Sequence, residues 1–125
     1  MPVAVEVRNK AWMVAALADC LCRHNAVWVL PDQVWMPSPL SVVGPLDVVT
    51  GPFAYLRLLG DRAAVDARTK TLDHIVIDRG ERVEEDAQAI GILRQRVPVV
   101  AFVNNHYAGY APETSRQLVE STARE

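Results

Sequence analysis

The sequence predicts an α/β fold with four parallel strands and flanking helices, and three observations carry this prediction. Four short segments rich in apolar and β-branched residues alternate along the chain with segments of helical periodicity. The strand segments are almost continuously apolar, which is typical of a parallel sheet covered by helices. Polar side chains recur where these segments end, at the edge where α/β folds build their sites.

The first part of the chain is predicted to form a strand, a helix and a second strand. Residues 2–8 (PVAVEVR) alternate with period two and read as the first strand. Asn9 is a favourable N-cap, and apolar side chains recur at helical spacing from about Lys10 to Arg23. Residues 26–32 (AVWVLPD) then read as a second, buried strand.

The remaining part continues the same alternation after a long interruption. Residues 33–52 are rich in proline and predict a loop, with one short helical turn around Leu40 to Val43. The elements expected after this loop are a strand at 52–60, an irregular polar segment at 61–80, a helix at 81–96, a strand at 98–105 and a helix from Pro112 to Thr122. No GxGxxG or GxxxxGK[ST] motif accompanies the strands, which excludes the usual dinucleotide and P-loop sites.

Composition places the chain among single-domain proteins without a membrane segment. It has 125 residues, half of them apolar, and a formal net charge of -2. No basic block indicates nucleic-acid binding, and no apolar run is long enough for a signal peptide or a membrane span. Cys20 and Cys22 stand too close on a predicted helix to pair, so we expect reduced thiols and a cytoplasmic protein.

Four segments resemble the YecE-like family, also called domain of unknown function 72. They are VEVRNKAW (5–12), the loop that begins with LPDQ (30–33), FAYLRLLGD (53–61) and FVNNHYAGYAPE (102–113), and they occur in the family's order. The resemblance implies a (β/α)8 TIM-type barrel of about twice this length. It covers the C-terminal half of that barrel, strands five to eight, so residues 1–125 are expected to form a single partial domain.

The absence of a first half leaves three explanations open. The chain is a truncated product or has a misassigned start, or it is a natural half that pairs with a separately encoded N-terminal half-barrel. Self-association into a closed barrel is the third. A half-barrel by itself is expected to leave two open sheet edges and to bare its apolar lining.

Two strands carry charged residues that are expected to face the barrel interior. Glu6 and Arg8 lie two residues apart on one strand, so the carboxylate can act as a base or ligand and the guanidinium can hold an anion. Tyr55 and Arg57 share a face of another strand and suggest a second anion-binding group. The alternative is that these charges only pair with one another inside the barrel.

Further polar residues follow two other strands. Asp32 is either a ligand or general base, or it caps the loop that follows it. Asn104, Asn105 and His106 end the last strand; the amides suit hydroxyls or a sugar, and the imidazole can transfer protons near neutral pH. The alternative for these three is also loop capping.

A bound cofactor is not indicated by the sequence. Glu6, Asp32 and His106 could share a divalent metal ion if their strand ends meet, but no compact metal-binding spacing such as HExxH supports such a centre. The cofactor is therefore left unknown.

These residues predict a hydrolase-like protein that acts on a phosphate- or sugar-bearing ligand. We expect Glu6, Asp32 and His106 to carry the chemistry and a second set to bind a small anionic ligand: Arg8, Tyr55, Arg57, Asn104 and Asn105. The alternatives are a non-catalytic binding module for nucleic acid or a partner protein, and an inactive truncated product. The resemblance adds no established reaction, and it leaves open whether the protein is an enzyme.

Overall fold

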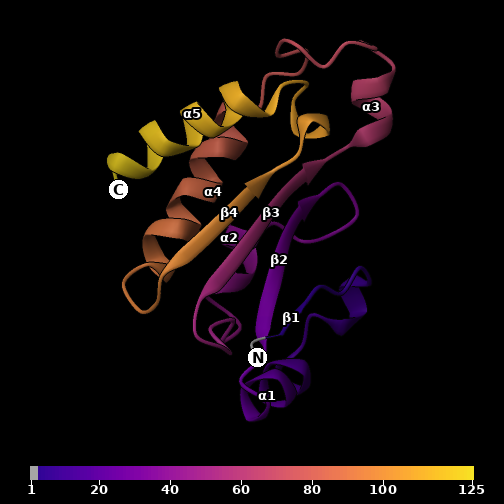
Figure 1. Ribbon diagram of the computed structural model, residues 1–125. Coiled ribbons are helices and arrows are strands. Elements are labelled where there is room, and N and C mark those ends of the chain that lie inside the picture. Colours follow the sequence, from indigo (N-terminus) through magenta and orange to yellow (C-terminus); the bar gives the residue numbers. More distant parts are fainter. Residues whose placement is uncertain (1–2) are drawn as a thin grey trace.

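A computed structural model describes residues 3–125 of the chain (Figure 1). Its strands are β1 (Ala4–Val5), β2 (Val27–Gln33), β3 (Ala54–Gly60) and β4 (Val99–Val103). Its α-helices are α1 (Ala15–Arg23), α2 (Pro39–Val43), α3 (Arg62–Asp66), α4 (Gly80–Leu93) and α5 (Ala111–Ala123), and two 3-10 helices are η1 (Lys10–Trp12) and η2 (Asn105–Tyr107). The predicted α/β order is confirmed.

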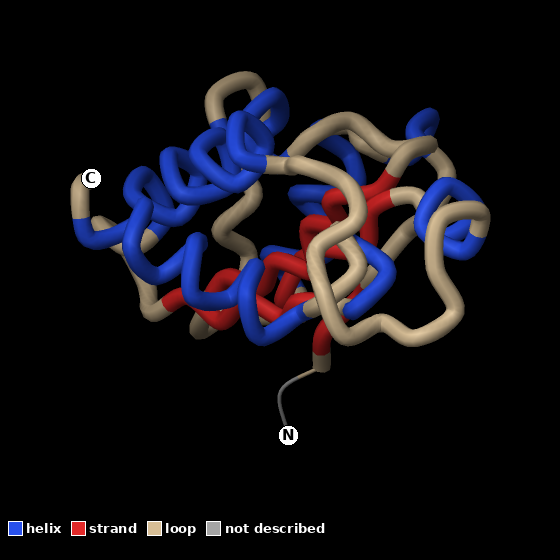
Figure 2. Tube along the Cα trace, turned by 90° about the horizontal axis from the view of Figure 1, so that it is seen from above, coloured by secondary structure: helices blue, strands red, loops and turns tan. Residues whose placement is uncertain are grey.

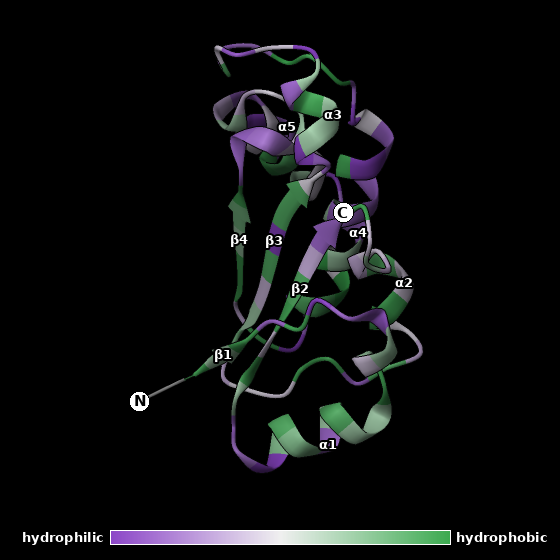
Figure 3. Ribbon diagram, turned by 90° about the vertical axis from the view of Figure 1, so that its right-hand side faces the viewer, coloured by the Kyte–Doolittle hydropathy of each residue, from purple (hydrophilic) through white to green (hydrophobic). Residues whose placement is uncertain are grey.

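The four strands form one parallel sheet in sequence order, β1-β2-β3-β4. Each strand therefore pairs with the next one along the chain, after a crossover that carries helix. Crossovers between parallel strands are right-handed, so crossovers that always advance in one direction place their helices on one face of the sheet. Figure 3 shows α2 and α4 together on one side of the strands.

The hydrophobic core lies between that face and the helices. Trp28 and Leu56 are fully buried from the sheet side, and Val83 and Leu93 are buried from α4. Burying a side chain of this size stabilises the fold by about 1.5–3 kcal/mol. The core therefore depends on the even-numbered residues of β2 and β3, which alternate toward the helices.

Local sequence signals explain where several elements begin and end. Ser38 caps α2 through its side-chain oxygen, and Pro39 occupies the first turn, so the proline-rich loop holds the short helix predicted there. Asp61 caps α3 in the same way. Asn25 adopts a φ of 50° just after α1, a backbone conformation that asparagine tolerates better than most residues.

Three predicted elements differ from the observed ones. The first strand is reduced to Ala4–Val5; of its predicted range, Pro2 lies outside the described residues. The single helix expected from Lys10 to Arg23 is divided, because Val14 is extended between η1 and α1. The segment at 61–80, expected to be irregular, contains α3.

The other face of the sheet carries no helix within residues 3–125 (Figures 2 and 3). Val100 and Phe102 of β4 remain 48% and 47% exposed there. A parallel sheet normally buries both faces, so this bare face is the unusual feature of the fold. No helix in the described part of the chain is both long and apolar enough to span a membrane.

Candidate functional site

The bare face holds several of the side chains singled out from the sequence. The strand register places Tyr55 beside Val29, and Arg57 beside Phe102. A hollow of about 310 Å³ on this face is lined by Ala4, Glu6, Val29, Tyr55, Arg57 and Phe102. We call the sheet surface defined by these six residues the open face.

Glu6 is the centre of an ion-pair cluster on the open face. Arg57 donates from Nη1 to both carboxylate oxygens at 2.9 and 3.0 Å, and Arg8 donates from Nε to Oε2 at 2.9 Å. The side chain of Glu6 is only 12% exposed and that of Arg57 is 29% exposed. Two guanidinium groups face one carboxylate, so the cluster carries one excess positive charge.

The guanidinium of Arg57 has unused hydrogen-bond donors. Its Nε and Nη2 donate to no other group among residues 3–125. The Cζ atom lies 5.7 Å from the centroid of the Phe102 ring, a cation–π distance that holds the planar group in place. Arg57 therefore presents fixed, unused donors on the open face, where an oxyanion could accept them.

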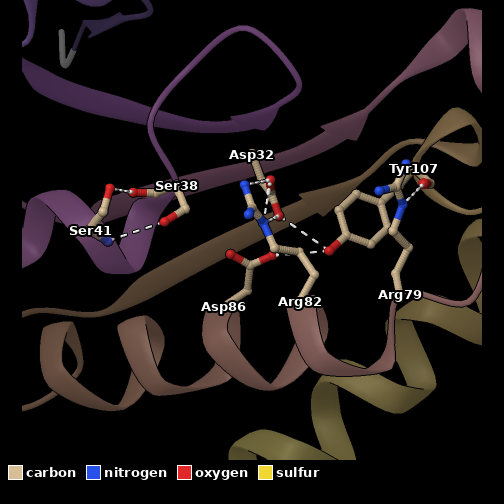
Figure 4. A network of polar contacts seen from close by, with 7 residues as sticks. All are labelled: Asp32, Ser38, Ser41, Arg79, Arg82, Asp86 and Tyr107. Carbon is tan, nitrogen blue, oxygen red and sulfur yellow. Dashed lines mark hydrogen bonds and ion pairs between the residues drawn. The ribbon is translucent and has the colours of Figure 1, made fainter.

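Asp32 lies at the end of β2, as predicted, but its side chain points to the helix-covered face (Figure 4). Arg82 of α4 donates to it from Nε at 3.0 and 3.1 Å and from Nη2 at 2.8 Å. The Tyr107 hydroxyl donates to Oδ2 at 3.2 Å. Asp32 is thus a buried, paired carboxylate on the opposite side of the sheet from Glu6.

Asp86 joins the same network one helical turn after Arg82. Its Oδ2 lies 3.3 Å from the Tyr107 hydroxyl, and its Oδ1 has no hydrogen-bond partner among the described residues. Burial, followed by the neighbouring carboxylate of Asp32, raises the pKa of Asp86 to about 9. Asp86 is therefore protonated at neutral pH, and the single negative charge of the pair is balanced by Arg82.

Burial also raises the pKa of Tyr107, so its hydroxyl stays protonated beside both carboxyl groups. The backbone around Tyr107 is held closely: Arg79 donates to its carbonyl oxygen at 3.0 Å, and a Cβ added at Gly60 would lie 2.8 Å from its Cα. We call Asp32, Arg82, Asp86 and Tyr107 the buried carboxyl network. It ties the end of β2 to α4 and to η2.

A groove of about 1230 Å³ opens beside the buried carboxyl network. Its walls come from the loop after β2, from α3, and from the helices α4 and α5. The Asp, Glu and Arg side chains that line it are seven acids and four arginines: Asp32, Asp61, Asp78, Glu81, Glu84, Glu85, Glu120, Arg68, Arg79, Arg82 and Arg124. This acidic excess disfavours an anionic ligand, so the open face is the better candidate for one.

Asn104, Asn105 and His106 cap the turn after β4. Asn104 Oδ1 accepts from the backbone N–H of His106 at 2.9 Å, and Asn105 Oδ1 accepts from that of Ala111 at 2.8 Å, at the start of α5. The ring of His106 lies 3.0 Å from Asp66 through Nε2 and 3.3 Å from Asn104 through Nδ1. Each nitrogen of the imidazole thus faces an acceptor oxygen, and a neutral imidazole can donate to only one of the two.

The structure therefore divides the predicted site residues. It brings Glu6 and Arg57 together with Arg8 and Tyr55, and it separates Asp32 and His106 from them. A shared metal centre of Glu6, Asp32 and His106 is not formed. Within residues 3–125 no group of three or more His, Cys, Asp or Glu side chains is arranged to hold a metal ion.

Four residues were missed by the sequence reasoning: Arg82, Asp86, Tyr107 and Phe102. Arg82 and Asp86 are four residues apart on α4, a spacing that places them on one helix face, and a buried acid beside apolar Val83 and Ala87 was the available signal. Tyr107 and Phe102 belong to the FVNNHYAGYAPE segment, and no local pattern there distinguishes these aromatic residues from ordinary core residues.

Comparisons with known proteins agree on one family. The family described as "Protein of unknown function DUF72" matches residues 1–125. A DUF72 protein of Enterococcus faecalis V583 has a similar solved structure, with 18% identity and a TM-score of 0.69, covering 98% of this chain and 48% of that one. A DUF72 protein of Thermotoga maritima MSB8 gives 22% identity and a TM-score of 0.70, covering 100% and 47%.

The chain thus spans about half the length of these solved proteins, whose likeness supports the fold. No curated protein matches it. Because the family match extends over every residue, the chain belongs to the DUF72 family, whose members are described as proteins of unknown function.

Proposed function

We propose that the open face binds a small anionic ligand bearing a phosphate or a sugar phosphate, and that Glu6 supports hydrolase-like chemistry on it. The observation that carries this proposal is the guanidinium of Arg57, which lies in the hollow with Nε and Nη2 unused. An arginine on a strand loses little freedom when it binds an oxyanion, because its backbone is already fixed by the sheet. Its planar donor edge matches two phosphate oxygens.

The charge of the cluster supports an anion rather than a cation. Glu6 neutralises one of the two guanidinium groups, and the other charge remains without a partner on the open face. Partial burial strengthens the attraction, since Coulomb interactions grow as the effective dielectric constant falls. Tyr55 and Phe102 line the same hollow and offer aromatic surface to the rest of the ligand.

Glu6 acquires a chemical role once an anion binds beside it. A phosphate that accepts hydrogen bonds from Nε and Nη2 of Arg57 shares the guanidinium with the carboxylate, which keeps its contact with Nη1. The carboxylate can then accept a proton from water while the water oxygen attacks phosphorus; the bond to the leaving oxygen breaks, and that oxygen takes a proton from solvent. Arg8 stays available to hold the carboxylate in position.

Titration calorimetry with inorganic phosphate and with glucose 6-phosphate tests the binding step. We expect Arg57→Ala to weaken phosphate binding about tenfold or more, because charge-assisted bonds contribute about 1.5–3 kcal/mol. The matched control is Arg62→Ala, since Arg62 is an exposed arginine on α3 that forms an ion pair with Asp66. Equal affinities of the wild type and Arg57→Ala would reject the site.

Glu6→Gln separates binding from chemistry. Removing the competing negative charge should leave phosphate binding intact or tighter, whereas release of inorganic phosphate from glucose 6-phosphate should be lost. If the wild type binds phosphate but releases none from any sugar phosphate tested, the open face is a binding module without hydrolase activity.

A further inference from the structure

We infer that the open face prefers, among anionic ligands, the phosphate ester of an aromatic alcohol, and that Tyr55 and Phe102 determine this specificity. The inference rests on the proposed anion site at Arg57 and names its substrate class. An aryl phosphate joins a charged group, which the guanidinium can bind, to a flat apolar ring without hydroxyl groups. The hollow on the open face offers a separate region for each of these two parts.

The six lining residues divide into a charged part and an apolar part. Glu6 and Arg57 form the charged part, and their ion pair connects the end of β1 with β3 across β2. The apolar part is contributed by all four strands and consists of Ala4 on β1, Val29 on β2, the ring of Tyr55 on β3, and Phe102 on β4. A phosphate bound at Arg57 therefore has apolar surface directly beside it.

Two aromatic rings neighbour the guanidinium that would hold the phosphate. Tyr55 precedes Arg57 by two residues on β3, so both side chains lie on the same face of the sheet. Phe102 pairs with Arg57 across the strands and remains 47% exposed, although the guanidinium lies 5.7 Å from the centre of its ring. Aromatic rings gain more from contact with another ring than the burial of area alone provides. These neighbours therefore favour an aromatic group next to the phosphate.

A sugar phosphate fits the hollow less well than an aryl phosphate. Its hydroxyl groups need hydrogen-bond partners when they leave water, because unpaired polar groups are costly. Apart from the charged pair, the hydroxyl of Tyr55 is the one polar side-chain group among the six lining residues, all within residues 3–125. Asn104 and Asn105, which were expected to bind hydroxyls, do not line the hollow, and their side-chain oxygens accept from backbone N–H groups.

The size of the hollow favours a small ligand. Its volume of about 310 Å³ lies at the lower end of the roughly 300–1,000 Å³ that small-molecule pockets span. A phosphate with a single aromatic ring is a ligand of this class, whereas an oligosaccharide or a dinucleotide would extend beyond the lining residues.

The chemistry proposed for Glu6 favours the same substrate class. Glu6 is the one carboxyl group among the six described lining residues, so it serves as the base and no second carboxyl group protonates the leaving oxygen. A phenolate leaves without such help more readily than an alkoxide, because the pKa of a phenol is about 10, as for the tyrosine side chain. Water adds to phosphorus and passes a proton to Glu6, while the bond from phosphorus to the aryl oxygen breaks; the phenolate takes the electron pair and is then protonated by solvent.

Titration calorimetry on the unmutated chain compares inorganic phosphate, glucose 6-phosphate, phenyl phosphate and cyclohexyl phosphate. Phenyl phosphate should bind about tenfold or more tightly than inorganic phosphate and glucose 6-phosphate, because its ring is buried on the apolar part of the hollow. It should bind about threefold more tightly than cyclohexyl phosphate, because only the aromatic ring gains the additional ring contacts. Inorganic phosphate should also be released faster from phenyl phosphate than from glucose 6-phosphate.

Substitutions at Tyr55 test whether its ring is responsible. Tyr55→Ala should weaken the binding of phenyl phosphate about tenfold and that of inorganic phosphate much less, whereas Tyr55→Phe, which keeps the ring, should bind both as the wild type does. Tyr55→Leu keeps an apolar side chain on β3, so it replaces Tyr55→Ala if that variant does not fold. The matched control is Tyr110→Ala, since Tyr110 is the N-cap of α5 and does not line the hollow.

The outcomes separate this inference from the anion site on which it rests. Phosphate binding that is absent, or that persists in Arg57→Ala, would reject the site and the inference together. Binding that depends on Arg57, but in which phenyl phosphate gains nothing over inorganic phosphate, would reject the inference alone. The inference is also overturned if cyclohexyl phosphate or glucose 6-phosphate binds as tightly as phenyl phosphate, or if the preference for phenyl phosphate survives the loss of the Tyr55 ring.

Discussion

Replacing Asp86 with asparagine should remove a pH-dependent loss of stability that the buried carboxyl network builds into the fold. Asp86 has a pKa raised from 3.8 to about 9 in the folded chain, so it holds its proton where the unfolded chain has released it. Between these values the unfolded state binds fewer protons than the folded state, and stability must fall as pH rises. The contribution is fully present below pH 3.8 and is lost progressively up to about pH 9.

The magnitude follows from proton linkage. One proton difference costs about 1.4 kcal/mol for each pH unit, so Asp86 alone should lower the free energy of unfolding by about 2.7 kcal/mol between pH 5 and pH 7. This is a large part of the 5–15 kcal/mol or so that stabilises a typical domain. Asparagine is neutral at every pH, and its side chain has nearly the same size and shape as the protonated carboxyl group.

Urea denaturation followed by tryptophan fluorescence measures this effect. The stability advantage of Asp86→Asn over wild type should grow by about 2.7 kcal/mol from pH 5 to pH 7, starting from similar stabilities below pH 3.8. Asp47→Asn is the matched control, because Asp47 is an exposed acid in a surface ion pair with Arg96. A constant difference between Asp86→Asn and wild type over this pH range would refute the assignment of the proton to Asp86.

Two further substitutions test how the network and its scaffold are held. Arg82→Ala leaves the buried carboxylate of Asp32 without its bidentate partner, so it should lower the free energy of unfolding by about 3–5 kcal/mol, measured by urea or thermal denaturation. The control is Arg116→Ala, in an exposed group of ion pairs, which should lower it by about 1 kcal/mol or less. Gly60→Ala should lower the free energy of unfolding by about 2 kcal/mol or more, because Gly60 has a φ of +69° and the added Cβ would lie 2.8 Å from the backbone of η2. The control is Gly44→Ala, which should be nearly neutral because Gly44 has open space around it. Equal effects of either substitution and its control would contradict the corresponding contact.

The order of elements could be predicted because it depends on local signals. These signals determine structure within a few residues and need no tertiary partner. They include apolar periodicity, Pro39 in the first turn of α2, and Asn25 after α1. The same signals predicted a longer first strand than the observed Ala4–Val5. Its length depends on a neighbour, because β1 pairs with β2 on one side only.

The grouping of Tyr55 with Arg57 was visible for a similar reason. In β3, buried residues alternate with partly exposed ones, so the pattern itself distinguishes the two faces of the strand. In β2 this information is absent, because residues 27–32 are all buried. A continuously apolar strand does not reveal which face Asp32 takes, and only the packing of α4 decided that its carboxylate meets Arg82 and not Glu6.

By itself, then, the sequence determined the alternation of strands and helices and the resemblance to DUF72 proteins, and it left the pairing of Glu6 with the strand arginines as one of two interpretations. Tertiary structure alone decided that pairing, the burial of Asp86, the contacts of His106 with Asp66 and Asn104, and the face on which Asp32 lies. The physical reason is the distance along the chain over which each signal acts. Periodicity and capping are properties of adjacent residues, whereas a shared proton or a bare sheet face arises from segments that meet only when the chain has folded.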